Sequence, residues 1–145
     1  SNSNSSNSPT FRQWVFEDVH NHLPPLILIL PPTHPILIDV REPAELLSTG
    51  TIPSSVNVPL ASQPDALFLT ADEFETRFGF PKPGVAADEA GREIVFYCKA
   101  GVRARAAAQL AVQAGYQADR VGVYDGSWLD WAAKGGKVEV WEGDD

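Results

Sequence analysis

The only cysteine of the chain, Cys98, ends an apolar run and precedes a short cationic segment. Residues 93–98 are mostly β-branched or aromatic, which predicts a buried strand that ends at the cysteine. A helix expected over residues 103–114 begins about five residues later. In such a turn, the loop N–H groups and the helix N-terminus point at the space above the sulfur and favour negative charge there. We therefore expect Cys98 to be a thiolate nucleophile.

The predicted active loop continues through the five residues that follow: Lys99, Ala100, Gly101, Val102 and Arg103. Gly101 allows a backbone conformation that a Cβ would resist. Three of the 11 cations of the chain lie within seven positions of the cysteine: Lys99, Arg103 and Arg105. Because the chain carries a net charge of −8, this local cluster predicts an anionic substrate.

The same residues also allow a structural interpretation. A lone cysteine is more often a small apolar residue of the core, and Lys99 and Arg105 could equally be solvated surface charges. The position of Cys98 at a strand-to-helix turn, followed by a glycine and flanked by cations, favours a reactive thiol. Three histidines, by contrast, lie in polar or Pro-rich surroundings and are expected at the surface: His20, His22 and His34.

Composition limits the classes of protein that the chain can belong to. Its 145 residues, 43% of them hydrophobic, suffice for one domain with its own core. The net charge of −8 argues against nucleic acid and anionic membranes as partners. No apolar run approaches the roughly 18 residues of a membrane span, and a single cysteine cannot form an internal disulfide. We expect an intracellular protein, mitochondrial or cytoplasmic. Because the chain contains no Met, an upstream targeting segment could be missing.

Strands and helices are expected to alternate along the chain. A Ser- and Asn-rich tail, residues 1–10, is expected to be disordered, one domain occupies 11–140, and 141–145 form an acidic end. We predict strands at residues 36–40, 56–58, 93–98 and 121–124, and helices at 43–48, from 70 to about 79, at 103–114 and at 127–134, with a short strand and a short helix within 11–23. The run at residues 26–30 fits either a strand or a turn of helix.

This alternation predicts an α/β fold with a mostly parallel central sheet and helices on both of its faces. Helix 103–114 is expected to bury the face formed by Ala107, Leu110, Ala111 and Ala114. Trp128 and Trp131 are expected in the core or in a pocket wall. The reactive site of such a sheet lies at the carboxyl ends of its strands, which is where Cys98 is placed.

The sequence resembles the rhodanese family over almost its whole length, from about residue 11 to residue 137. Four motifs carry the resemblance: Asp-x-Arg at residues 39–41, Gly-x-Ile-Pro with Asn-Val-Pro at 50–59, Cys-x-x-Gly-x-Arg at 98–103, and Gly-Ser with a later Trp at 126–131. It looks most similar to the small single-domain thiosulfate sulfurtransferases of eukaryotes. The resemblance implies a three-layer rhodanese-like fold, in which Asp39 and Arg41 lie beneath the active loop and fix it through hydrogen bonds.

The resemblance also implies an activity, sulfur transfer through a Cys98 persulfide. Thiosulfate or a persulfide would be the small anionic donor, and glutathione, another thiol or a protein thiol would be the acceptor, with cyanide as an assay acceptor. No cofactor or metal is expected. Alternatives are a cysteine phosphatase of the same fold and a silent rhodanese-like module that binds a protein. The related phosphatases place five residues between Cys and Arg, whereas this loop has four, which favours a single sulfur atom over a phosphate.

Overall fold

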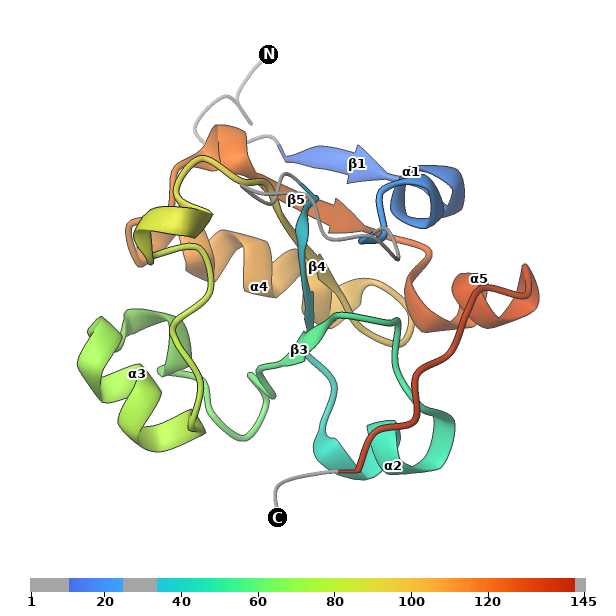
Figure 1. Ribbon diagram of the computed structural model, residues 1–145, viewed down its shortest axis with the longest axis horizontal. Coiled ribbons are helices and arrows are strands. Elements are labelled where there is room, and N and C mark those ends of the chain that lie inside the picture. Colours follow the sequence, from blue (N-terminus) through green and yellow to red (C-terminus); the bar gives the residue numbers. More distant parts are fainter. Residues whose placement is uncertain (1–10, 25–33, 143–145) are drawn as a thin grey trace.

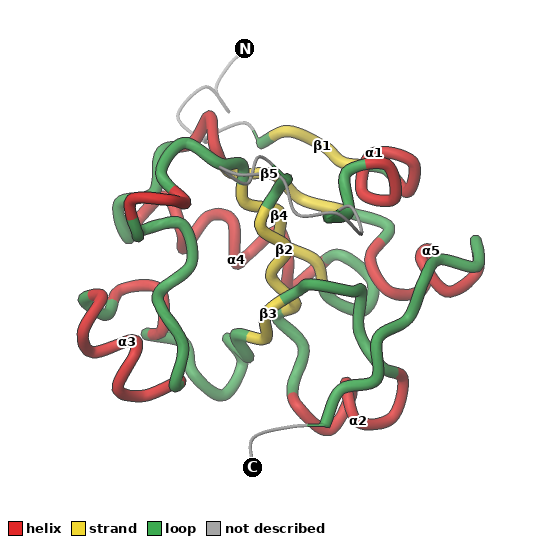
Figure 2. The backbone as a smooth tube through the Cα atoms, viewed as in Figure 1, coloured by secondary structure: helices red, strands yellow, loops and turns green. Residues whose placement is uncertain are grey.

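The computed structural model describes residues 11–24 and 34–142. Within them, five strands form one sheet in the order β1-β5-β4-β2-β3, and every pairing is parallel. The strands are β1 (Arg12–Trp14), β2 (Ile36–Asp39), β3 (Val56–Asn57), β4 (Ile94–Tyr97) and β5 (Val121–Tyr124). The predicted α/β class and parallel sheet are confirmed, and the short strands lie at the centre of the molecule (Figure 2).

The described residues also form five α-helices around the sheet: α1 (Phe16–Asn21), α2 (Pro43–Thr49), α3 (Ala71–Phe78), α4 (Val102–Gln113) and α5 (Ser127–Ala133). Their ends follow from local sequence. Pro43 occupies the first turn of α2, where its missing N–H costs nothing. Thr70 and Glu73 form a reciprocal capping box at the start of α3, and Gly79 ends that helix in the left-handed conformation.

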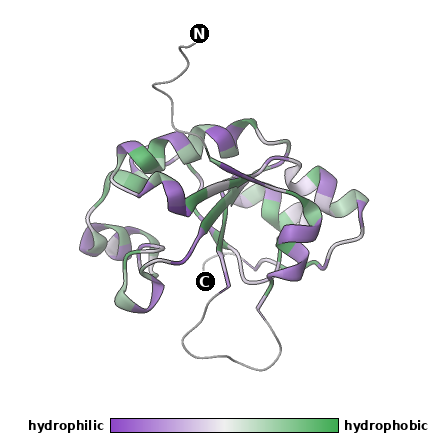
Figure 3. Ribbon diagram, turned by 90° about the horizontal axis from the view of Figure 1, so that it is seen from above, coloured by the Kyte–Doolittle hydropathy of each residue, from purple (hydrophilic) through white to green (hydrophobic). Residues whose placement is uncertain are grey.

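Each face of the sheet has its own apolar core. On one face, Ile38 and Phe96 pack against α4 and α3, and on the other, Leu37 and Val95 pack with the tryptophans Trp14 and Trp131. The helices therefore form layers on both sides, with α3 and α4 opposite α1 and α5 (Figure 1). Hydrophobic residues are concentrated in the strands between these layers (Figure 3).

The buried face of α4 differs in part from the predicted one. Its fully buried residues are four alanines: Ala104, Ala107, Ala108 and Ala111. Leu110 and Ala114 are only partly buried. The small side chains let the helix approach the sheet closely, so its contact face includes the N-terminal turn that follows the cysteine.

The N-terminal strand and helix predicted within residues 11–23 are present as β1 and α1. Residues 26–30, the expected tail at 1–10 and the last three residues lie outside the described part of the chain. His20 and His22 are exposed as expected, and His34 is partly buried. Among the described helices, none is long and apolar enough to cross a membrane.

Candidate active site

Cys98 directly follows β4, the central strand of the described sheet. All four residues of β4 are buried, and Cys98 itself is only 1% exposed. Its Sγ accepts a hydrogen bond from the backbone N–H of Gly101 at 3.0 Å. The thiol is therefore both packed against the core and held by a main-chain donor of the loop that leads into α4. Such a donor stabilises negative charge on sulfur.

Gly101 is required by the shape of this loop. Its φ is 105°, a conformation that side chains rarely adopt, and a Cβ there would lie 2.5 Å from the carbonyl oxygen of Asp125. Lys99, Ala100 and Val102 are exposed. These three side chains thus point outward, and the backbone N–H of Gly101 lies close to the sulfur.

The start of α5 supports the other side of the loop. The Ser127 Oγ accepts a hydrogen bond from the Cys98 N–H at 3.1 Å and donates to the Tyr124 carbonyl at 2.9 Å. The N–H groups of Trp128 and Leu129 donate to the carbonyls of Cys98 and of the residue after it, at 2.9 and 3.1 Å. Ser127 has a φ of 59°, which is uncommon for a residue with a side chain. Sequence reasoning placed Ser127 in a motif but missed this contact.

Arg103 is bound to Glu45, a residue that sequence reasoning missed. Its two terminal nitrogens donate to Glu45 Oε2 and Oε1 at 2.7 and 3.0 Å, so the pair is bidentate and ties α4 to α2. The hydrogen bond from Arg103 lowers the pKa of Glu45 from 4.5 to about 2, and the same bond raises the pKa of Arg103. The charge of Arg103 is therefore largely neutralised beside the loop.

The other two cations of the cluster differ in their surroundings. Arg105 is paired with Asp125. Lys99 is exposed and makes no ion pair within the described ranges. The expectation of three available cations therefore reduces to one, because two of them already face carboxylates that are distant in sequence.

Asp39 and Arg41 form a buried ion pair, with 2.8 Å between Arg41 Nη2 and Asp39 Oδ2. Arg41 also donates to Thr49 Oγ1 at 2.9 Å and to the Gly50 carbonyl at 3.0 Å. Within the described residues these hydrogen bonds fix the end of α2, whereas bonds to residues 98–103 had been expected. Arg41 contacts the site through Trp128, because its guanidinium lies 4.8 Å from that ring centre.

Tyr97, next to the cysteine, faces the opposite side of the sheet. Its hydroxyl lies 2.7 Å from Thr51 Oγ1 and accepts a bond from the Ile52 N–H at 3.1 Å. Desolvation raises the pKa of this phenol well above its usual value, so it stays neutral. The residue therefore anchors the end of β4 to the segment before β3. Trp128 and Trp131 are buried in the same core, as predicted.

Comparison with known proteins agrees with this geometry. A profile of the rhodanese-like domain matches residues 28–134. A thiosulfate:glutathione sulfurtransferase of Saccharomyces cerevisiae is 38% identical over 138 residues, 92% of this chain and 87% of the relative. A human protein of the same description is 32% identical and covers 77% of this chain and 91% of its own length.

Solved structures of single-domain sulfurtransferases are also similar to this chain. A single-domain sulfurtransferase of Saccharomyces cerevisiae superposes with a TM-score of 0.71 and 37% identity, covering 88% of this chain and 93% of its own. A human single-domain sulfurtransferase superposes with a TM-score of 0.57 and 32% identity, covering 69% of this chain and 82% of its own. With the parallel sheet and the loop at the carboxyl end of its central strand, these matches show that the chain belongs to the rhodanese family.

Proposed function

We propose that Cys98 is the residue that carries sulfur in the sulfurtransferase reaction of this chain. The observation that supports this role is the 3.0 Å hydrogen bond from the Gly101 N–H to the Sγ, at the N-terminal end of the 12-residue helix α4. A main-chain donor and a helix N-terminus at the same sulfur favour the thiolate and, after transfer, an anionic persulfide.

Two half-reactions follow from this assignment. The Cys98 thiolate attacks the outer sulfur of thiosulfate, the S–S bond of the donor breaks, and sulfite leaves with the bonding electrons. A thiol acceptor then removes the outer sulfur from the persulfide. Thiosulfate and glutathione are favoured as donor and acceptor because both appear in the descriptions of the yeast and human relatives. We place the reaction inside the cell, in mitochondria or cytoplasm, since two relatives are described as mitochondrial.

The remaining loop residues have distinct proposed roles. Ala100 and Val102 contribute backbone to the active loop around the sulfur. Gly101 supplies both the N–H that donates to the Cys98 Sγ and the backbone turn that only a glycine adopts easily. Lys99 attracts the anionic donor, because its ammonium is the exposed charge nearest the cysteine in sequence. Arg103 holds the loop to α2 through Glu45. Asp39 and Arg41 act at a distance, through the packing of Arg41 on Trp128.

The length of the active loop favours sulfur transfer over phosphate hydrolysis. Four residues lie between Cys98 and Arg103, and the Arg103 fork is occupied by a carboxylate. A phosphoryl group needs several donors around its oxygens, with Arg free to bind them. The short loop and the ion-paired Arg103 therefore favour transfer of a single sulfur atom over binding of a phosphoryl group.

The test compares wild type with Cys98→Ala in thiosulfate:cyanide and thiosulfate:glutathione sulfur transfer. We expect the variant to lose turnover while keeping its circular dichroism spectrum and its urea midpoint, since Ala fills a similar small space. Hydrolysis of an aryl phosphate by wild type should be negligible. Substantial sulfur transfer by Cys98→Ala would refute the assignment, and a Cys98-dependent phosphatase rate above the sulfur-transfer rate would reverse the choice of chemistry.

A further inference from the structure

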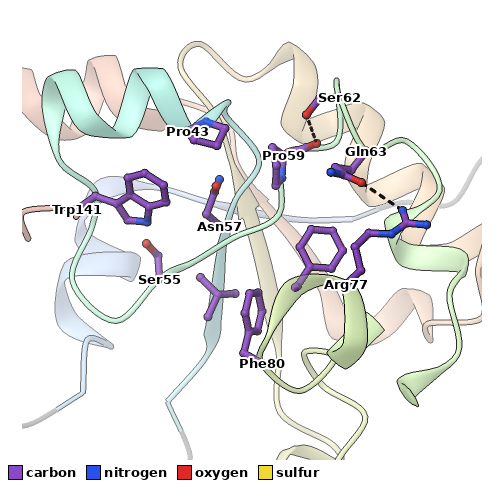
Figure 4. A pocket seen from close by; sticks show the side chains of 11 residues that line it. Pro43, Ser55, Asn57, Pro59, Ser62, Gln63, Arg77, Phe80 and Trp141 are labelled. Atoms are coloured by element: carbon purple, nitrogen blue, oxygen red, sulfur yellow. Dashed lines mark hydrogen bonds between the residues drawn. The ribbon is translucent and has the colours of Figure 1, made fainter. Parts of the chain in front are cut away.

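A cavity of about 480 Å³ lies at the free edge of the sheet, beside β3. Aromatic and proline side chains form most of its apolar wall: Pro43, Pro59, Phe78, Phe80 and Trp141. Figure 4 shows Trp141 on one side, Phe80 and Arg77 on the other, and Asn57 between them. The two sides come from distant parts of the chain, since residues 137–142 pack back onto the turn before β3 through the Thr51–Glu139 backbone pair.

The edge strand presents unpaired backbone groups to this cavity. The Val58 N–H donates to the Asp39 carbonyl, so the backbone of Val58 faces β2. Because a strand alternates direction at each residue, the N–H and C=O of Asn57 face away from β2. Neither group bonds another described residue, and β3 has one neighbour in the described sheet. A free donor and acceptor on an edge strand are what an extended peptide binds.

The charge of the cavity restricts what enters it. Arg77 is the one charged side chain among its described lining residues. That guanidinium is bound to Asp65 at 2.7 and 3.2 Å and to Gln63 at 3.2 Å. The walls therefore offer no uncommitted cation to a carboxylate ligand. Aromatic rings and amides fit an uncharged peptide with apolar side chains better than they fit an acidic small thiol.

The cavity is close enough to the cysteine to position an acceptor. In the sheet, Tyr97 lies beside Asp39, and Asp39 lies beside Asn57. A peptide strand added at Asn57 lies one inter-strand step further out, so three steps, about 14 Å, separate it from the end of β4, a span of about four extended residues. The Asn57 Nδ2 also donates to the carbonyls of Asp39 and Arg41, at 2.9 and 2.8 Å. The cavity and the active loop thus share the carboxyl edge of the sheet.

We propose that this cavity is a second acceptor subsite, additional to the one used by glutathione, and that it takes an extended, uncharged peptide segment flanking a cysteine of a second protein. The inference rests on the proposed function. The peptide adds along Asn57, places an apolar side chain between Trp141 and Phe80, and then crosses the carboxyl ends of β3 and β2 toward Cys98. The proton of its cysteine thiol moves to the outer sulfur of the anionic Cys98 persulfide, the resulting thiolate attacks that sulfur, and the sulfur–sulfur bond to Cys98 breaks. Cys98 leaves as a thiolate, the proton stays on the new persulfide, and no oxidant is needed.

Kinetics of the second half-reaction test the inference. Cys98 is first loaded with thiosulfate and the protein is desalted, and loss of the added sulfur is followed by rapid quench and mass spectrometry. Two peptides of equal length are compared, Ac-Phe-Ala-Ala-Ala-Cys-amide and Ac-Glu-Ala-Ala-Ala-Cys-amide, with rates expressed per thiolate. The uncharged peptide should react about tenfold faster than the acidic peptide at equal concentration.

The matched variants are Trp141→Ala, which removes a wall, and Val140→Ala, whose side chain is 77% exposed and outside the cavity. Trp141→Ala should slow the uncharged peptide about tenfold and leave the acidic peptide little changed, whereas Val140→Ala should match wild type for both. Equal rates for the two peptides, or a Trp141→Ala protein that matches wild type, would overturn the proposal.

A binding experiment keeps this inference separable from the proposed function. Calorimetric titration of Cys98→Ala with Ac-Phe-Ala-Ala-Ala-Ser-amide needs no sulfur chemistry. Binding that weakens about tenfold on adding Trp141→Ala supports the subsite, and absence of binding contradicts it. Failure of thiosulfate to load Cys98 would contradict the proposed function, and the calorimetric result would still decide whether the cavity binds peptide.

Discussion

Replacing the two partners of the Arg103–Glu45 pair, singly and together, separates the electrostatic role of the arginine from its anchoring role. Arg103→Gln removes the cation and leaves the Glu45 carboxylate near the path of an anionic donor. Glu45→Gln removes the anchor of the loop and sets the Arg103 charge free. The double variant is neutral and unanchored. The three proteins therefore change charge and anchoring in different combinations.

The size of the expected changes in stability depends on how exposed the Arg103 and Glu45 side chains are. The two side chains are 35% and 30% exposed, so solvent screening reduces the stability contribution of the pair to about 1 kcal/mol, well below the size that its pKa shifts alone would suggest. Each single variant should lose about 1 kcal/mol of unfolding free energy, and the double variant should lose less than the sum. An uncompensated carboxylate near a dianionic donor raises the barrier by about 1 kcal/mol, so Arg103→Gln should lower kcat/KM for thiosulfate about fivefold.

Urea unfolding measures the first quantity and steady-state kinetics with varied thiosulfate measures the second. Glu45→Gln should lose less than about threefold in kcat/KM, because the freed cation offsets the looser loop. Additive losses of stability in the double variant would show that the two side chains do not act as a pair. A Glu45→Gln protein as impaired as Arg103→Gln would show that anchoring, and not charge, controls the reaction with the donor.

Three further outcomes are expected. Gly101→Ala should cost at least about 2 kcal/mol in urea unfolding and abolish sulfur transfer, because its Cβ meets a carbonyl oxygen at 2.5 Å and its φ of 105° is strained. Ser127→Ala should cost about 1–3 kcal/mol and slow sulfur transfer, since the buried Cys98 N–H loses its acceptor; unchanged activity and stability would refute that role. The lowered pKa of Glu45 gives stability that is present above about pH 4.5 and is lost as the pH falls through about 2, so acid should destabilise wild type by about 1 kcal/mol more than Glu45→Gln.

Much of the fold could be predicted because its determinants are local. The capping residues Thr70 and Glu73 and the stop at Gly79 define α3 within ten residues. The position of Cys98 could be predicted for the same reason, since strand, loop and helix are contiguous in the sequence. Its chemical role stays a prediction, as do the roles of its loop neighbours.

The partners of the loop could not be predicted from local pattern. Glu45 meets Arg103 across 58 positions and Ser127 meets Cys98 across 29, and only the order of strands in the sheet brings them together. Arg41 was expected to bond the loop, but its guanidinium bonds Asp39 and the end of α2 and stacks on Trp128. Predicting such contacts requires the tertiary register.

Intact-protein mass spectrometry after incubation with thiosulfate tests the central claim most directly. Wild-type protein should gain the mass of one sulfur atom, peptide mapping should place it on Cys98, and a reducing thiol should remove it. Cys98→Ala should gain nothing under the same conditions. A wild-type protein that gains no sulfur, or a Cys98→Ala protein that gains it, would contradict the assignment of Cys98 as the sulfur carrier.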